Sequence, residues 1–243
     1  MIENPATAIV TGAGKRIGAY VAAALVERGW TVLAHVRSQG DAVPAGTVPV
    51  AADLADPNCA AQIFEAAAAL GPVRLLVNNA ARFAWDGFGE FSASEFDAHM
   101  HANVRAPILL IQEFAARHGG GDALVVNLLD SKLASPNPDF LSYTLSKQAL
   151  LGATELAARA LAAGGIRVNG ISPALMLKSP GQSDLNFDSM HRRNPLRRGV
   201  APADVVAAID YLLAATTVTG EVLTIDAGHR FDPPARDVQL LEP

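Results

Sequence analysis

Residues 6–18 read Ala-Thr-Ala-Ile-Val-Thr-Gly-Ala-Gly-Lys-Arg-Ile-Gly, and this stretch decides the fold. A short apolar run precedes the glycine-rich turn, and apolar residues at helical spacing follow it until Gly29. The pattern predicts a strand, a tight turn and a helix. Glycines let the backbone approach a phosphate, and a helix start offers unpaired N–H groups. The stretch therefore predicts a dinucleotide site. Its cofactor-binding residues would be Gly12, Lys15, Arg16, Ile17 and Gly18.

The alternation of strand and helix continues along the chain. Further strands are predicted at residues 31–38, 48–52, 73–77, 124–129, 166–171 and 219–225. Helices are predicted at residues 60–70, 94–112, 142–162 and 202–213. This order favours an α/β fold of the Rossmann type, doubly wound, with a seven-stranded parallel sheet and helices on both faces. Because we find no repeat, linker or boundary, residues 1–243 are predicted to form a single dinucleotide-binding domain.

Composition excludes several classes of protein. The net charge is -5, which argues against a nucleic-acid-binding surface. Cys59 is the only cysteine, so neither a disulfide framework nor a thiolate metal cluster is expected, and we predict no metal. Residues 1–5 lack a signal pattern, and no apolar stretch reaches the roughly 18 residues that span a membrane. We therefore expect a soluble cytoplasmic protein that acts on a small molecule.

The end of the second predicted strand indicates which dinucleotide is bound. Sites that prefer NAD tend to place an acid there to bind the ribose diol. This chain has His35, Arg37 and Ser38 instead. A guanidinium and a hydroxyl suit a 2′-phosphate, so NADP(H) is favoured. Alternatively, these residues form a solvated strand end.

A second informative stretch runs from Asp130 to Lys147. Tyr143 and Lys147 are four residues apart, so on a helix their side chains lie on one face. A neighbouring ammonium lowers the pKa of a phenol, which is ordinarily about 10. Asp130 follows an apolar run, so its carboxyl would lie at a strand end, where open α/β sheets bind ligands. The pattern predicts a proton-donating site, although Tyr143 and Lys147 could instead form a solvated helix face and Asp130 could cap a loop while pointing outward.

Other polar and aromatic residues follow the predicted strands or interrupt the helices. Asn78 and Asn79 could cap the next element or line a cofactor cleft. Phe83 could pack within its loop or offer a face to a flat ring. Asn103 falls in the middle of the helix predicted at residues 94–112, where asparagine is locally unfavourable.

Two segments interrupt the alternation of strands and helices. Residues 175–198 are polar, contain Pro180, Gly181 and Pro195, and show no sustained period. A loop of this length in a compact domain is usually functional or disordered, and we predict a substrate lid. Residues 229–243 form a tail without a clear pattern, and its residues Arg230 and Phe231 could approach the cleft of a neighbouring subunit.

Taken together, the motifs resemble the short-chain dehydrogenase/reductase superfamily over nearly the whole chain. The matching residues are Thr11, Gly12 and Gly18, Asp53 and Leu54, Asn78 to Ala80, Asn103, Tyr143 with Lys147, and Pro173. Arg16 stands where the family usually has a glycine, and Asp130 where it usually has a serine. These departures, with Phe83 and the residues from His35 to Ser38, are similar to the pteridine reductase and dihydromonapterin (dihydrofolate) reductase branch.

The resemblance implies roles for these residues. The catalytic set would be Asp130, Tyr143, Lys147 and Asn103, the last holding a water in the proton relay. Cofactor binding would add Asp53, Leu54, Asn79, Ala80, Tyr143, Lys147 and Pro173 to the residues given above. The substrate would contact Arg16, Phe83, Asp130 and Tyr143, with its ring between Phe83 and the nicotinamide. The resemblance also implies a homotetramer that pairs the helix Tyr143–Ala162 and the last strand. The apolar stripe on that helix, which includes Leu150, could equally pack on its own sheet.

The acid at position 130 favours C=N over C=O reduction. A serine hydroxyl can hold a ketone oxygen as it becomes an alkoxide, whereas a carboxylate would repel that charge. At ~4 Å and an effective dielectric of ~20, the repulsion is of order 4 kcal/mol. A carboxyl can instead pair with ring N–H groups or help protonate a ring nitrogen. We therefore expect an NADPH-dependent reductase of a pterin or dihydropterin. The alternatives are a generic NADP-dependent carbonyl reductase or alcohol dehydrogenase, and a non-catalytic nucleotide-sensing or scaffold protein.

Overall fold

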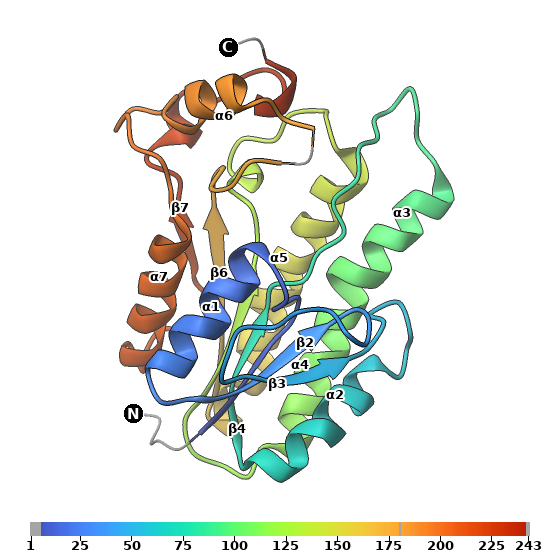
Figure 1. Ribbon diagram of the computed structural model, residues 1–243, viewed down its shortest axis with the longest axis vertical. Helices are drawn as coiled ribbons and strands as arrows, with labels where there is room; N and C mark the ends of the chain where they lie inside the picture. Colours follow the sequence, from blue (N-terminus) through green and yellow to red (C-terminus); the bar gives the residue numbers. More distant parts are fainter. Residues whose placement is uncertain (1–5, 180, 242–243) are drawn as a thin grey trace.

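The computed structural model describes residues 6–179 and 181–241 (Figure 1). The prediction about residues 1–5 lies outside the described residues. So do Pro180 of the predicted lid and the last two residues of the predicted tail, Glu242 and Pro243.

A seven-stranded parallel sheet forms the centre of the molecule, as predicted. Its strands are β1 (Thr7–Val10), β2 (Thr31–Val36), β3 (Val48–Ala51), β4 (Val73–Asn78), β5 (Ala123–Leu128), β6 (Ile166–Pro173) and β7 (Val222–Ile225). Their spatial order is β3-β2-β1-β4-β5-β6-β7, so the winding reverses between β1 and β4. In open α/β sheets, ligands bind at the carboxyl ends of the strands beside such a reversal. The predicted Rossmann-type fold is confirmed.

Helices cover both faces of the sheet (Figure 1). They are α1 (Arg16–Glu27), α2 (Cys59–Ala67), α3 (Ala93–Met100), α4 (Ala106–Arg117), α5 (Leu141–Leu161), α6 (Asp184–His191) and α7 (Pro202–Ala214). One apolar core lies between the sheet, α1 and α7, and a second lies between the sheet, α2 and α4. Successive strand residues point to opposite faces, so Leu75 and Val77 join the first core and Leu76 the second.

The apolar stripe of α5 packs mainly inside the subunit. Leu150 is 1% exposed, and Ala157 and Leu161 pack against the second core. Of the two interpretations of this stripe, packing on the chain's own sheet therefore accounts for these three side chains.

The helix predicted at residues 94–112 is divided, which corrects the prediction. A π-helical turn, His101–Arg105, separates α3 from α4. The side chain of Asn103, within this turn, is buried and bonds to groups outside the helix. Turns of this kind are frequent at functional sites.

The segment predicted as an irregular lid contains α6. Ser183 caps this helix by accepting a hydrogen bond from the backbone N–H of Asn186 at 3.1 Å. Met190 is buried on its inner side. The helix has only eight residues and few apolar ones, which is why the sequence shows no sustained period there.

Short single turns complete the chain. Three-residue 3-10 turns lie at Ala68–Leu70, Ser131–Leu133, Ala162–Gly164, His229–Phe231 and Val238–Leu240. Within the described residues, no helix combines the length and the apolarity that crossing a membrane requires.

Candidate active site

One cavity of about 240 Å³ lies at the carboxyl ends of the strands. It is lined by all four predicted substrate-binding residues: Arg16, Phe83, Asp130 and Tyr143. Ile17 and Pro173 line it as well, and residues from the lid and the tail close it. The fold therefore brings together residues that are far apart in the sequence, as predicted for Arg16 and Tyr143.

The carboxyl of Asp130 turns into this cavity and not outward. Oη of Tyr143 donates a hydrogen bond to its Oδ2 at 2.8 Å, and the backbone N–H of Lys132 donates to its Oδ1 at 2.9 Å. Ser172 on β6 fixes the backbone by donating to the carbonyl oxygen of Asp130 at 2.6 Å. Asp130 also caps the turn Ser131–Leu133, so it has both the capping role and the inward orientation that the sequence left as alternatives.

Tyr143 is held in place by the start of α5. Phe140, the residue before this helix, has a left-handed backbone (φ 54°) and provides no side-chain cap. The buried carboxyl of Asp86 supplies one, because it accepts hydrogen bonds from both the backbone N–H and Oγ of Ser142. The first turn of the helix, which bears Tyr143, is thereby anchored to the loop after β4.

The expected lowering of the Tyr143 pKa is wrong for this arrangement of side chains. Burial raises the pKa of Tyr143 well above 10, and the carboxyl of Asp130 adds to the rise. Nζ of Lys147 donates to the carbonyl oxygen of Leu128 at 2.6 Å and lies 5.7 Å from the centre of the tyrosine ring. Burial lowers the pKa of Lys147 to about 8. Tyr143 is therefore a neutral donor here, bonded to an acid.

Removal from water also changes the carboxyl of Asp130. It raises the pKa of this group, and the bonds from Lys132 and Tyr143 only partly oppose the rise. Asp130 and Tyr143 therefore form a pair that binds protons more tightly than either group does in water.

Phe83 packs against neighbouring aromatic rings and also lines the cavity. Its ring stacks on Phe140, with centroids 4.3 Å apart, and forms a T-shaped contact with Tyr143, with centroids 4.7 Å apart. It is nevertheless 42% exposed and lines the cavity, so part of the ring is accessible to a ligand there.

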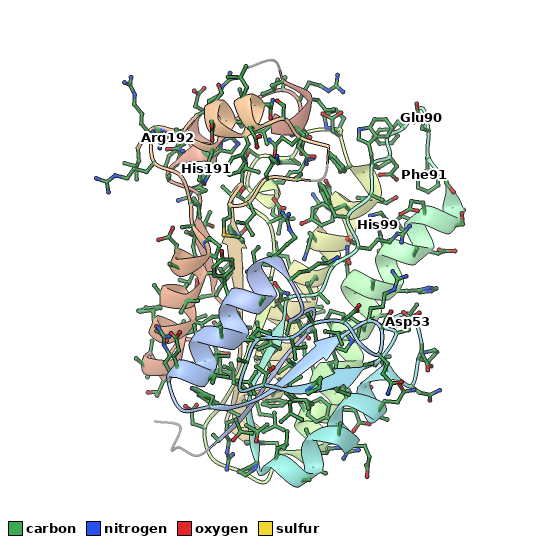
Figure 2. The ribbon with its side chains drawn as sticks, viewed as in Figure 1. Asp53, Glu90, Phe91, His99, His191 and Arg192 are labelled. Atoms are coloured by element: carbon green, nitrogen blue, oxygen red, sulfur yellow. The ribbon has the colours of Figure 1, made fainter. Side chains whose placement is uncertain are left out.

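The loop that carries Phe83 is held by the helices behind it. The side chain of Asn103 forms two hydrogen bonds with the backbone of Arg82. It accepts one from the N–H at 2.7 Å and donates one to the carbonyl oxygen at 2.9 Å. Its second amide hydrogen goes to Ser146 at 2.9 Å. His99, labelled on α3 in Figure 2, accepts from the N–H of Ala84 at 3.3 Å. Both amide hydrogens of Asn103 thus have acceptors in the protein, one in the loop and one on α5, and its predicted role in holding a water stays a prediction.

The turn between β1 and α1 fits the diphosphate of a dinucleotide. α1 begins without a capping side chain and without an acidic residue in its first turn, so its N–H groups and positive dipole end can face an anion. Gly12 has a left-handed backbone with φ 65°. A Cβ at Gly18 would lie 2.2 Å from the carbonyl oxygen of Gly12, so only glycine fits there. Lys15 is exposed at this helix start.

Arg16 links this turn to the lid. It has a left-handed backbone (φ 52°), which costs a residue other than glycine about 1–3 kcal/mol. Its guanidinium donates to the carbonyl oxygens of Lys178 and Leu177 at 2.8 and 3.2 Å. The side chain therefore holds the lid against the dinucleotide turn, and its predicted contacts with cofactor and substrate stay predictions.

His35 lies beneath the turn, and its predicted role in cofactor binding is corrected by its hydrogen bonds. It is 2% exposed, Nδ1 accepts from the N–H of Gly12 at 3.2 Å, and Nε2 bonds the carbonyl oxygen of Ala52 at 3.0 Å. Because both ring nitrogens are occupied, His35 supports the turn and does not offer a nitrogen to a phosphate. Burial accordingly lowers its pKa. Arg37 and Ser38 are exposed at the end of β2, as a 2′-phosphate site requires.

The remaining predicted cofactor residues lie along the same strand ends. Asp53 is exposed after β3, whereas Leu54 is packed in the second core. Asn79 donates to the carbonyl oxygen of Thr11 at 2.8 Å. Oγ1 of Thr11 in turn accepts from the N–H groups of Asn79 and Ala80, both at 3.0 Å. Thr11 thus ties the two strands at the winding reversal and belongs with the site, although the sequence pattern assigned it no role.

A closing strap formed by residues 232–241 is a feature that the sequence patterns missed. Asp139 accepts from Nε of Arg236 at 2.8 Å and from the N–H of Asp237 at 2.7 Å. Lys132 donates to Asp237 at 3.2 Å. Pro234, Asp237, Val238 and Gln239 consequently line the cavity. No local signal predicts this strap, because its partners lie far away in the chain.

Comparisons with known proteins agree with this geometry. A family model described as enoyl-(acyl carrier protein) reductase matches residues 12–230. Carbonyl reductase [NADPH] 2 of Sus scrofa is 31% identical, with 91% of this chain and 95% of that protein covered. Pteridine reductase 1 of Leishmania tarentolae is 30% identical, with the same two coverages.

Among solved structures, FolM alternative dihydrofolate reductase 1 from Brucella canis, complexed with NADP, superposes with a TM-score of 0.87. It is 31% identical, and the match covers 96% of each chain. The relatives thus include reductases of carbonyl compounds and of pteridines.

Proposed function

Because this chain belongs to the short-chain dehydrogenase/reductase superfamily, we propose that it is an NADPH-dependent reductase of a pterin or dihydropterin. The substrate would be of the dihydrobiopterin, dihydromonapterin or dihydrofolate class. The observation that carries the proposal is the 2.8 Å hydrogen bond from Tyr143 to the inward-facing carboxyl of Asp130. The NADP complex of the Brucella canis reductase and the pteridine reductase relative support it.

NADP(H) would bind across the winding reversal of the sheet. The diphosphate would lie at the start of α1, and the exposed Arg37 and Ser38 would receive the 2′-phosphate. Bound NADPH supplies a hydride from its nicotinamide ring. The proposed cofactor set also contains Asp53, Leu54, Asn79, Ala80, Tyr143, Lys147 and Pro173.

Asp130 and Tyr143 would protonate the substrate. The raised pKa values of both groups keep a proton on the pair at neutral pH, so it can be given to a ring nitrogen. A carboxyl can also accept hydrogen bonds from the N–H groups of a pterin. Lys147, with a pKa of about 8, would be mostly charged at pH 7 and would offset the negative charge that the pair acquires.

Phe83 and Asn103 would position the substrate. Phe83 lines the cavity, and Phe140 stacks on its ring. Asn103 holds the backbone beside it. A flat ring between Phe83 and the nicotinamide would lie with its nitrogens near Tyr143.

A carbonyl reductase of the same superfamily is the second candidate, favoured by the similarity to carbonyl reductase [NADPH] 2. Against it stands the carboxyl of Asp130, which would repel a developing alkoxide beside Tyr143. A non-catalytic nucleotide-sensing or scaffold protein is the third candidate, and the intact Tyr143, Lys147 and Asn103 oppose it.

The test is the oxidation of NADPH and of NADH by the purified protein with a pterin panel and a ketone panel. We expect turnover of at least one of dihydrobiopterin, dihydromonapterin and dihydrofolate, with NADPH preferred. Turnover of ketones without turnover of any pterin would refute the proposal in favour of the second candidate. Binding of NADPH without any turnover would favour the third.

We also propose a cytoplasmic homotetramer that associates through α5 and β7. Leu156 on α5 is 71% exposed and Leu145 is 41% exposed, which supports contact through this helix. A monomer in analytical ultracentrifugation would refute the assembly.

A further inference from the structure

Four arginines lie in the short segment between α6 and α7. They are Arg192, Arg193, Arg197 and Arg198, in a chain whose net charge is -5. All four are exposed. Throughout residues 6–179 and 181–241, no side chain forms a hydrogen bond or an ion pair with any of these guanidinium groups.

The backbone of this segment is well defined by internal hydrogen bonds. Nδ2 of Asn194 donates to the carbonyl oxygen of Arg198 at 2.8 Å, and its Oδ1 accepts from the N–H of Arg198 at 3.2 Å. Arg197 has a left-handed backbone with φ 50°, and its N–H bonds the carbonyl oxygen of Asn194 at 2.9 Å. The N–H of Leu196 donates to the carbonyl oxygen of Ala227 at 3.2 Å, which ties the segment to the end of β7. The arginines therefore project from an ordered loop.

The loop borders the candidate active site. A surface groove is lined by Arg192, Arg193, Asn194, Pro195, Arg197 and Asp232. Asn194 and His191 also line the cavity that contains Tyr143. Asn194 therefore lies between the groove and the cavity, and the groove carries three guanidinium groups and one carboxylate.

The groove is separate from the proposed 2′-phosphate site. Figure 2 labels His191 and Arg192 beside α6, and Asp53, which follows β3, on the opposite side of the view. β3 pairs with β2, whose end carries Arg37 and Ser38. The adenosine end of the cofactor would lie with β2, so the arginine groove has no cofactor phosphate to bind.

We propose that Arg192, Arg193 and Arg197 bind a carboxylate tail of the substrate whose ring occupies the cavity beside Tyr143. The substrate class would be a dihydropterin with a glutamyl tail, as in dihydrofolate, and longer glutamyl tails would bind more tightly. This inference rests on the proposed function, and it narrows the proposed class of substrates to dihydropterins with a glutamyl tail.

Size and charge both support the tail site. The cavity of about 240 Å³ is smaller than the roughly 300–1,000 Å³ that holds a whole drug-sized ligand, so a substrate with a tail would extend beyond it. Guanidinium groups bind carboxylates through paired N–H donors. Because the guanidinium groups are exposed, each contact with a carboxylate should raise the affinity only a few-fold. Two or three contacts together should raise it about 10- to 100-fold.

The experiment compares Arg192→Gln/Arg193→Gln with the matched control Arg198→Gln/Arg159→Gln. The control also removes two positive charges. Arg198 is in the same loop but outside the groove, and Arg159 is exposed on α5. Dissociation constants for dihydrofolate, its triglutamate and dihydrobiopterin are measured by calorimetry with NADP+ present. Thermal denaturation checks that both variants fold.

We expect the groove variant to weaken triglutamate binding about 10-fold more than dihydrobiopterin binding, with dihydrofolate between them. Added salt should weaken triglutamate binding to the native protein and to the control variant. Equal weakening of all three ligands, a control as impaired as the groove variant, or no binding of triglutamate by the native protein would overturn the proposal.

Turnover separates this inference from the proposed function. Reduction of dihydrobiopterin with no tail-dependent difference would overturn only the tail site. A tail-dependent difference in affinity without reduction of any pterin would uphold the tail site and overturn the proposed activity.

Discussion

Oη of Tyr143 lies 2.8 Å from Oδ2 of Asp130, and the hydrogen bond joins the first turn of α5 to the end of β5. Removal from water raises the pKa of each group. An acid in this position supports transfer of a proton to nitrogen, because a carboxylate would oppose the charge of a nascent alkoxide. The pair therefore favours a nitrogen heterocycle over a ketone.

Replacing Asp130 should reverse the preference between substrates. In Asp130→Ser, we expect kcat/KM for the best pterin to fall by about 10²- to 10⁴-fold, because a proton-transfer group is lost. Reduction of ketones should be preserved or should rise, because the repulsion of an alkoxide disappears. Asp130→Asn, which keeps the shape and removes the charge, serves as the companion variant. Unchanged pterin reduction in both variants would contradict the assignment.

Removing the ring of Phe83 should affect binding more than folding. In Phe83→Ala, KM for the pterin should rise roughly 10-fold, since stacking of a flat heterocycle on an aromatic ring contributes about 1–3 kcal/mol. The melting temperature should change little, because Phe83 is 42% exposed. Phe88→Ala is the control, since Phe88 is in the same loop and 83% exposed. An equal effect of both variants on KM would argue against stacking.

Asn103 should matter for the stability of the loop that carries Phe83. Asn103→Ala removes the partners of the N–H and carbonyl groups of Arg82. We expect the free energy of unfolding to fall by about 2 kcal/mol, because backbone groups lose their hydrogen bonds. Denaturant unfolding would measure this loss. Activity should fall too, and hydrogen exchange should speed up at residues 82–84. If Asn103→Ala reduced activity while hydrogen exchange at residues 82–84 stayed slow, the result would instead support a role of Asn103 in holding a water.

The buried ammonium of Lys147 should leave a signature in the pH dependence of stability. Its pKa is lowered to about 8 in the folded state, whereas an unfolded lysine titrates at about 10.4. Between these values the unfolded chain binds more protons, so the contribution of Lys147 to stability increases with pH. Relative to Lys147→Met, the native protein should gain about 1.4 kcal/mol of unfolding free energy per pH unit in this range. A difference independent of pH would show that the pKa of the ammonium is not lowered.

Breaking the strap should open the cavity. Asp139→Ala removes the acceptor for Arg236 and for the N–H of Asp237. We expect faster hydrogen exchange at residues 234–240 and a higher KM for the substrate, with the global melting temperature nearly unchanged. Asp188→Ala, an exposed acid on α6, is the matched control. If hydrogen exchange at residues 234–240 were as slow in Asp139→Ala as in the native protein, Asp139 would not hold the strap.

Arg16, His35 and Asn103 illustrate where local sequence patterns reach their limit. The sequence predicts Arg16 at the cofactor phosphates, which stays a prediction, but it does not predict the hydrogen bonds that the guanidinium donates to the lid carbonyls of Leu177 and Lys178. It places His35 among the cofactor-binding residues, yet both ring nitrogens are used beneath the turn. It predicts Asn103 within one continuous helix, yet this residue lies in a π-helical turn and bonds the loop beside it. Each outcome depends on a partner distant in the sequence, which a local pattern does not specify.

By itself, the sequence determined the order of the seven strands, the dinucleotide turn, and the placement of Tyr143 and Lys147 on one helix. Those features follow from periodicity and glycine positions, which act over a few residues. Only the tertiary structure decided the direction of the Asp130 carboxyl, the hydrogen bonds of His35 and Arg16, and the strap over the cavity. The physical reason is that these contacts join segments far apart in the chain, such as Asp139 and Arg236, 97 residues apart. Their formation depends on how whole elements pack, and on which buried groups find partners there.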